Sequence, residues 1–141
     1  MKINNQGISR TVFIFKNFVI KVPKIRYGWY YFIVGLCSNI EENRCWKALI
    51  LNPEMRELLA PVKWCSWGGW MLIMQKANVT KHITELNGKE DGENYREFRQ
   101  QYYKDWINAG LGGDDKPDNY GYINNKLVKV DYPNFTDKSI K

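Results

Sequence analysis

A short stretch near the C-terminal end of the chain concentrates side chains that could hold a metal ion or a phosphate group. Residues 112–133 read GGDDKPDNYGYINNKLVKVDYP and contain four aspartates, Asp114, Asp115, Asp118 and Asp131. Asn119 adds an amide oxygen within the acidic part. Carboxylate and amide oxygens are the ligands that hard cations such as Mg²⁺ prefer. The stretch is therefore either a polar surface loop or a site for metal and phosphate.

The composition predicts a folded globular chain with reduced cysteines. Its 141 residues suffice for one domain or two small lobes, and 44% apolar with 15% aromatic residues argue against a disordered chain. Cys37, Cys45 and Cys65 include no CxxC pair, so we expect reduced core residues in a cytoplasmic protein. The single histidine, His82, argues against a Ser-His dyad and against a multi-histidine metal site.

Charge and hydropathy bear on whether the chain binds nucleic acid, nucleotides or a membrane. A net charge of +6 is compatible with nucleic acid, with nucleotide phosphates or with solubility alone. No basic run alternates with aromatic residues in a recognisable module, so we do not expect a nucleic-acid-binding protein. No apolar run reaches the length of about 18 residues that a membrane span needs, so we expect no membrane partner.

Two hairpins are predicted in the first half of the chain. The segments Thr11–Phe15 and Phe18–Val22 are rich in β-branched and aromatic residues and are joined at Lys16–Asn17. A second pair, APVKWCSW and WMLIMQKA, flanks Gly68–Gly69, where glycine adopts positive φ at low cost. We therefore expect an antiparallel sheet with at least four strands.

Helices are predicted in three places. The stretch SNIEENRCWKALIL indicates a helix that begins after an aromatic connection, because Ser38 and Glu41 have capping-box spacing. Pro53 favours a second, short helix that ends by Leu59. Aromatic residues at intervals of three and four predict a third helix over residues 94–109.

The last part of the chain is expected to contain a linker and a third hairpin. Residues 78–93 are polar and contain two glycines, which is typical of a linker. Tyr120–Ile123 and Leu127–Val130 are short apolar segments around Asn124–Asn125. Because asparagine tolerates left-handed geometry, this pair predicts a turn between two strands.

Taken in order, these features resemble the protein-kinase-like fold. Gly7–Phe13 lies where that family has its phosphate-covering loop, and Phe18–Lys21 resembles its VAIK strand. Asp114–Asn119 is similar to the DLKPEN catalytic loop, and Val130–Pro133 falls where the metal-binding DFG would be. The resemblance covers nearly the whole chain and rests on order and spacing, since the first two motifs are weak individually.

The resemblance implies an α+β fold in two parts that form one compact unit. Residues 1–77 would be a kinase-like N-lobe, an antiparallel sheet with one αC-type helix. Residues 78–141 would be a reduced C-lobe of one long helix and a short hairpin, because the chain ends ten residues after Asp131. So short a kinase-like chain suggests a compact genome, such as that of a phage.

The resemblance also implies roles for five polar residues in phosphoryl transfer. Lys21 would supply positive charge to the nucleotide phosphates, held in place by an ion pair with Glu42. We select Glu42 over its neighbour in the capping box because it has an apolar residue one turn below it. Asp114 would orient the acceptor hydroxyl. Asn119 and Asp131 would coordinate Mg²⁺.

Further residues would contact ATP in a kinase-like protein. Gly7 would belong to the loop over the phosphates. Met74 is predicted to be a core residue at the end of a strand, next to the adenine in this family. Residues from Gln75 to Ala77 would form the hinge whose backbone meets the base.

Several positions depart from the family pattern. The phosphate-covering loop keeps Gly7 but has Asn5 and Arg10 where other glycines are expected, which hinders close approach of the backbone to phosphates. Gly112–Gly113 replaces the usual His-Arg before the catalytic aspartate. Pro133 replaces the last residue of DFG and removes an N–H donor.

Two functions from different classes are therefore in competition. The first is a minimal kinase-like protein that binds Mg-ATP and transfers phosphoryl to a protein or small-molecule hydroxyl. The alternative is a catalytically inactive kinase-like protein that inhibits or mimics a partner through an aromatic surface. Aromatics of the 94–109 helix, such as Tyr102 or Tyr103, would form that surface or a homodimer contact. In either case we expect a cytoplasmic protein, in the host cytoplasm if a phage encodes it.

Overall fold

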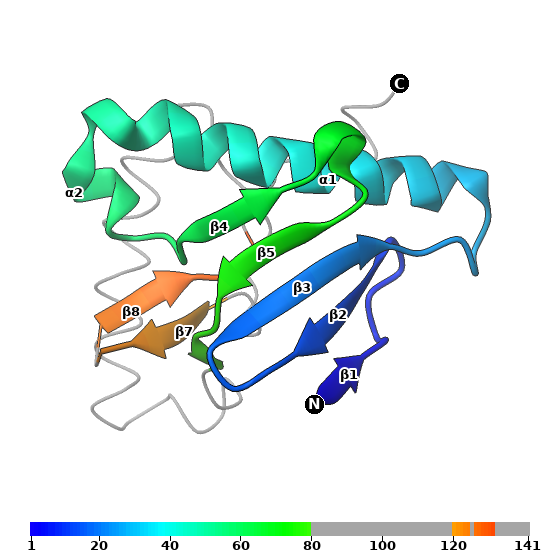
Figure 1. Ribbon diagram of the computed structural model, residues 1–141, viewed down its shortest axis with the longest axis horizontal. Helices are drawn as coiled ribbons and strands as arrows, with labels where there is room; N and C mark the ends of the chain where they lie inside the picture. The colour runs from blue at the N-terminus through cyan, green and yellow to red at the C-terminus, as the bar shows by residue number, and fades with distance from the viewer. Residues whose placement is uncertain (80–119, 125, 132–141) are drawn as a thin grey trace, which may run out of the picture.

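A five-stranded antiparallel sheet in the order β1-β2-β3-β5-β4 is the larger of the two sheets in the described part of this α+β fold (Figure 1). The structure, a computed structural model, describes residues 1–79, 120–124 and 126–131. The strands of this sheet are β1 (Lys2–Asn4), β2 (Arg10–Ile14), β3 (Phe18–Pro23), β4 (Val62–Cys65) and β5 (Leu72–Gln75). The hairpin expected at Lys16–Asn17 joins β2 to β3, and β1 adds an outer strand that the sequence did not reveal.

The second predicted hairpin is also confirmed, with β4 and β5 as its antiparallel strands. The connection is a 3-10 turn, η2 (Trp67–Gly69), in which both Gly68 and Gly69 have positive φ, at 74° and 76°. Gly69 additionally lies close to the helix, because a Cβ at this position would be 2.3 Å from the carbonyl oxygen of Leu36. Glycine is therefore needed here both for the turn and for the packing.

One long helix, α1 (Trp29–Ala48), runs along the sheet (Figure 1), and this corrects the helix start expected at Ser38. The helix begins nine residues earlier, at Trp29, directly after Gly28, which has a non-helical φ of 107°. Ser38 is buried within the helix and cannot cap it, and Glu41 pairs with Arg44 instead. Aromatic residues crowd the first turns on several sides, so this part lacks the one-sided apolar period by which a helix is recognised.

Two short helical segments follow α1. The 3-10 helix η1 (Leu49–Leu51) leads into α2 (Pro53–Arg56). The Asn52 side chain caps α2 by accepting a hydrogen bond from the Met55 backbone N–H at 3.3 Å. The short helix expected after Pro53 is thus present, although it ends at Arg56 rather than at Leu59.

A second, three-stranded sheet in the order β6-β7-β8 contains the third predicted hairpin. Its strands are β6 (Asn78–Val79), β7 (Tyr120–Ile123) and β8 (Lys126–Lys129), and Asn124 in the turn has a φ of 50°. Lys129 donates its backbone N–H to the Leu58 carbonyl and accepts from the Ala60 N–H, at 2.8 and 2.9 Å. These two bonds attach the hairpin to the segment that enters β4 of the larger sheet.

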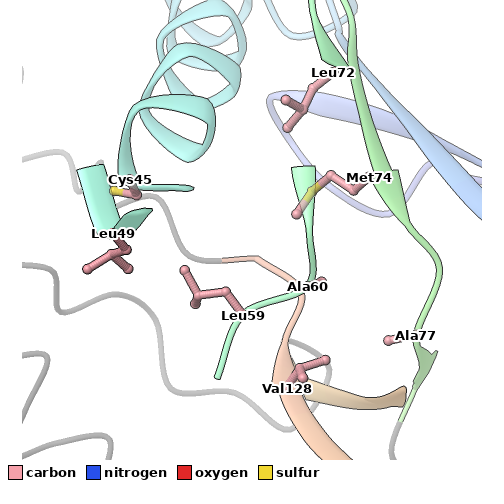
Figure 2. Packing of buried hydrophobic residues seen from close by; sticks show 8 residues of the cluster. All are labelled: Cys45, Leu49, Leu59, Ala60, Leu72, Met74, Ala77 and Val128. Carbon is pink, nitrogen blue, oxygen red and sulfur yellow. The ribbon is translucent and has the colours of Figure 1, made fainter. Parts of the chain in front are cut away.

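The core lies where α1, the segment before β4, and the two sheets meet (Figure 2). Its buried apolar residues are Cys45, Leu49, Leu59, Ala60, Leu72, Met74, Ala77 and Val128. Met74 is buried, as expected for a core residue at the end of a strand. All three cysteines are free, and Cys45 is the one that is fully buried.

Some expectations fall on residues outside the described ranges. These include the helix over 94–109, the linker beyond Val79 and both Tyr102 and Tyr103. Within the described ranges, none of the helices has the length and apolar character that a bilayer crossing requires.

Gly35 allows α1 to approach the sheet closely, and a methyl group there should destabilise the protein. A Cβ at Gly35 would lie 2.4 Å from the Ser9 carbonyl oxygen and 3.1 Å from Pro23. We expect Gly35→Ala to cost about 1–3 kcal/mol of unfolding free energy through overpacking, although alanine favours a helix over glycine by about 1 kcal/mol. Urea denaturation measures this cost, with the exposed Lys47→Ala as a control in the same helix. An unchanged or increased stability of Gly35→Ala would contradict the close packing.

Candidate functional site

Four charged side chains from distant parts of the chain contact one another at the face of the five-stranded sheet that packs against α1. We call Arg10, Lys21, Glu42 and Asp131 the charged quartet; they come from the start of β2, from β3, from α1 and from the residues just after β8. The side chains of Arg10, Lys21 and Glu42 are at most 9% exposed, whereas that of Asp131 is 41% exposed. Two positive and two negative groups give the quartet no net charge.

The register of the first hairpin explains why two cations share this site. Arg10 lies opposite Pro23, and Val12 lies opposite Lys21. Because side chains alternate between the faces of a sheet, Arg10 and Lys21 point to the same face. That face packs against α1, so both positive charges are buried and require negative partners.

Lys21 makes the contact with Glu42 that the motif resemblance predicts. Its Nζ donates to both carboxylate oxygens of Glu42, at 2.9 and 3.0 Å. The same Nζ donates to the Val130 carbonyl at 2.7 Å and lies 3.9 Å from Oδ1 of Asp131. Lys21 therefore links the sheet and α1 to the chain that follows β8.

Arg10 is a member of the site that sequence reasoning missed. Its guanidinium donates to Asp131 Oδ1 at 2.5 Å, to Glu42 Oε1 at 3.1 Å and to Asn39 Oδ1 at 3.1 Å. From the sequence alone, Arg10 is identified only as a residue that replaces a glycine of the phosphate-covering loop. The alternation of side chains together with the register of the β2–β3 hairpin was the available signal, because the two place Arg10 on the same face as Lys21.

Asn39 holds the backbone around the quartet. It is fully buried, and its side-chain amide nitrogen donates to the carbonyls of Lys21 and Gly69, at 3.1 and 2.8 Å. Its oxygen accepts from Arg10, so both donor hydrogens and the acceptor are used. Asn39 thereby fixes the position of α1 relative to β3 and η2.

The charges of the quartet alter the acidity of its carboxyl groups. Burial opposes ionisation of Asp131, but the positive charges of Arg10 and Lys21 outweigh it and hold its pKa well below the usual value. Burial raises the pKa of Glu42, against the opposing effect of the same two cations. Three donor contacts onto the two oxygens of Glu42 fit its ionised form.

Among the described residues, the others predicted to contact ATP form no hydrogen bond or ion pair with the quartet, and Gln75 lies opposite Phe18, at the other end of β3 from Lys21. Gly7 lies in the loop between β1 and β2, where Lys24 Nζ donates to its carbonyl at 3.1 Å and to that of Asn5 at 2.6 Å. Gln75 ends β5, two residues before the buried Ala77. Asp114 and Asn119 lie outside the described residues.

The quartet in this arrangement does not fit a magnesium ion. A divalent cation needs carboxylate oxygens that are free of other positive charges. Oδ1 of Asp131 instead has the Arg10 guanidinium at 2.5 Å and the Lys21 ammonium at 3.9 Å. Within residues 1–79, 120–124 and 126–131, no group of three or more His, Cys, Asp or Glu side chains could hold a metal ion.

A hollow of about 440 Å³ lies elsewhere, between α2 and the β7–β8 hairpin. Trp46, Arg56, Leu59, Ile123 and Val128 are among its lining residues. No member of the charged quartet lines it. It therefore adds nothing to the chemistry of the quartet.

The comparisons with family models and with curated proteins supply no relative from which a role could be transferred. No protein-family model matches this chain, and no curated protein matches it. The interpretation of the charged quartet consequently depends on its own geometry.

Glu42 should be far more important for stability than its neighbour Glu41. Glu42→Gln leaves Arg10 and Lys21 buried with half of their negative charge removed, which should cost about 3–5 kcal/mol of unfolding free energy. Glu41→Gln is the matched control, since its partner Arg44 is 67% exposed and the loss should be at most about 1 kcal/mol. Chemical denaturation of both variants measures the difference. Equal costs would show that the buried contacts of Glu42 do not stabilise the fold.

Proposed function

We propose that this chain is a kinase-like protein that binds a nucleoside triphosphate beside Lys21 and transfers its terminal phosphoryl group to a protein or small-molecule hydroxyl. The observation that carries the proposal is the pair of hydrogen bonds from Lys21 on β3 to Glu42 on α1, at 2.9 and 3.0 Å. Protein kinases use a strand lysine, oriented by a helix glutamate, to hold the nucleotide phosphates.

The surroundings of Lys21 support this proposal in a second way. Asp131 follows the β7–β8 hairpin, and its Oδ1 lies 3.9 Å from the ammonium nitrogen of Lys21. The aspartate of the DFG-like motif is therefore adjacent to the strand lysine. Phosphoryl transfer needs positive charge against the phosphates and a group that orients the attacking hydroxyl. Lys21 would provide the charge, and Asp114 would orient the hydroxyl.

The adenine and the metal complete the proposal. Gly7 would lie over the phosphates, and the strand end at Met74 and Gln75, with Ala77, would contact the base. The family pattern would make Asn119 and Asp131 the ligands of Mg²⁺, but the arrangement described above does not fit this ion, because Arg10 donates to Asp131.

Nucleotide titration of the intact chain tests the proposal. We expect ATP to bind at least tenfold more tightly than adenosine, a difference of about 1.4 kcal/mol, because Lys21 interacts with phosphate rather than with base. Isothermal calorimetry measures both affinities, and Lys21→Gln should remove the preference for ATP. Lys16→Gln is the matched control, since Lys16 is exposed in the turn between β2 and β3.

Two outcomes would contradict parts of this function. If ATP does not bind, or binds no better than adenosine, nucleotide binding is wrong. If ATP binds but radiolabelled phosphoryl transfer, including autophosphorylation, is absent, the catalytic part alone is wrong. Should Lys21→Gln fail to fold, comparing ATP, ADP and adenosine on the unmodified chain still measures the contribution of the phosphates.

A second function, a catalytically inactive kinase-like interaction protein, is favoured by two observations. Arg10 neutralises the carboxylate of Asp131. A catalytic metal site would need this carboxylate as a ligand. Aromatic side chains are also exposed, with Trp29 at 70% and Trp67 at 92%. Such a surface suits contact with a partner protein or a second copy of the chain.

Asp131→Ala separates the two functions, since an enzyme loses phosphoryl transfer whereas an interaction protein keeps its binding.

A further inference from the structure

The hollow between α2 and the β7–β8 hairpin has the size and the lining of a small-molecule site. Its volume of about 440 Å³ lies within the range of about 300–1,000 Å³ that ligand pockets occupy. Most of the described residues around it are apolar, namely Trp46, Pro53, Leu59, Pro61, Ile123 and Val128. Such a lining favours the apolar body of a ligand, because binding removes both apolar surfaces from water.

Arg56, which also lines the hollow, is a cation without a carboxylate partner in the part of the chain that the structure describes. Its guanidinium carbon lies 3.9 Å from the centre of the Trp46 ring, and its Nε is buried without a hydrogen-bond acceptor. The neighbouring Glu57 pairs with Lys126 instead, at 2.7 Å. Contact with an aromatic ring uses the face of a guanidinium and leaves the N–H donors at its edge. Arg56 is therefore able to donate to an incoming anion.

The charges around the hollow suit a ligand with one negative charge. Arg56 and Lys126 contribute two positive charges to the described lining, and Glu57 contributes one negative charge. Because Lys126 and Glu57 neutralise each other, the remaining charge is that of Arg56. A triphosphate would bring several negative charges close to Glu57. A single carboxylate, in contrast, can accept two hydrogen bonds from one guanidinium.

We propose that this hollow binds a small apolar carboxylic acid, whose carboxylate accepts hydrogen bonds from Arg56. Its hydrocarbon body would pack against Leu59, Ile123 and Val128. No member of the charged quartet lines the hollow, so this inference does not depend on the proposed function. Arg56 belongs to α2, whereas Ile123 and Val128 belong to the hairpin. A bound acid would therefore link these two parts of the fold.

Three eight-carbon probes that differ only in their head group test this inference: octanoate, octanol and octylamine. Calorimetry on the unmodified chain should show octanoate binding at least about tenfold more tightly than octanol. Octylamine should bind more weakly than either, because its cation would face Arg56. Arg56→Gln keeps a donor but removes the charge, so it should lower the affinity for octanoate at least about tenfold and leave that for octanol unchanged. Arg44→Gln is the matched control, since Arg44 is 67% exposed, pairs with Glu41 and does not line the hollow.

Nuclear magnetic resonance locates the bound octanoate. The indole N–H of Trp46 and the backbone amides of Ile123 and Val128 should shift during the titration, whereas the amide of Phe13 in β2 should not. Shifts confined to other residues, or no binding of octanoate, would overturn the site. Equal affinities for octanoate and octanol, or an unchanged affinity of Arg56→Gln for octanoate, would overturn the role of the guanidinium. If Arg56→Gln does not fold, the three probes on the unmodified chain still decide whether a carboxylate is preferred.

Discussion

The fold depends on a single buried carboxylate, that of Glu42, which has no exposed surface and accepts hydrogen bonds from both Lys21 and Arg10. A carboxylate without water is unfavourable unless cations and hydrogen bonds surround it. Glu42 is therefore favourable only if α1 packs against the face of the β2–β3 hairpin that carries Arg10 and Lys21. Gly35 and Gly69 allow this approach, since a side chain at either would collide with a backbone carbonyl.

The quartet also joins the two ends of the described chain. Arg10 and Asp131 are 121 positions apart in the sequence and form a direct ion pair. The β7–β8 hairpin positions Asp131 next to Arg10, because β8 forms backbone hydrogen bonds with the segment before β4. Perturbed acidities of this kind occur in structural ion-pair networks as well as at functional sites. Because Arg10 balances the charge of Asp131, the quartet is neutral and joins the sheet and α1 to the residues after β8.

Local patterns explain which features the sequence could predict. The hairpins were found because β-branched segments and turn-forming residues are adjacent, as at Gly68–Gly69 and Asn124. The predicted start of α1 was wrong for two reasons. Aromatic residues crowd the first turns of the helix on several sides, and Ser38 has capping-box spacing to Glu41. The contact of Lys21 with Glu42 was anticipated only through a resemblance between motifs. Arg10 was missed because its partners are 29 to 121 positions away, and the alternation of side chains along the β2–β3 hairpin indicates its face but not those contacts.

A double-mutant cycle between Arg10 and Asp131 tests the central claim most directly. The unfolding free energies of the unmodified chain, Arg10→Gln, Asp131→Asn and the double variant give the coupling energy between the two side chains. Direct contact in the quartet predicts a favourable coupling of about 0.5–3 kcal/mol. A coupling energy indistinguishable from zero would contradict the account, because the ion pair that joins the two ends of the site would then be absent in solution.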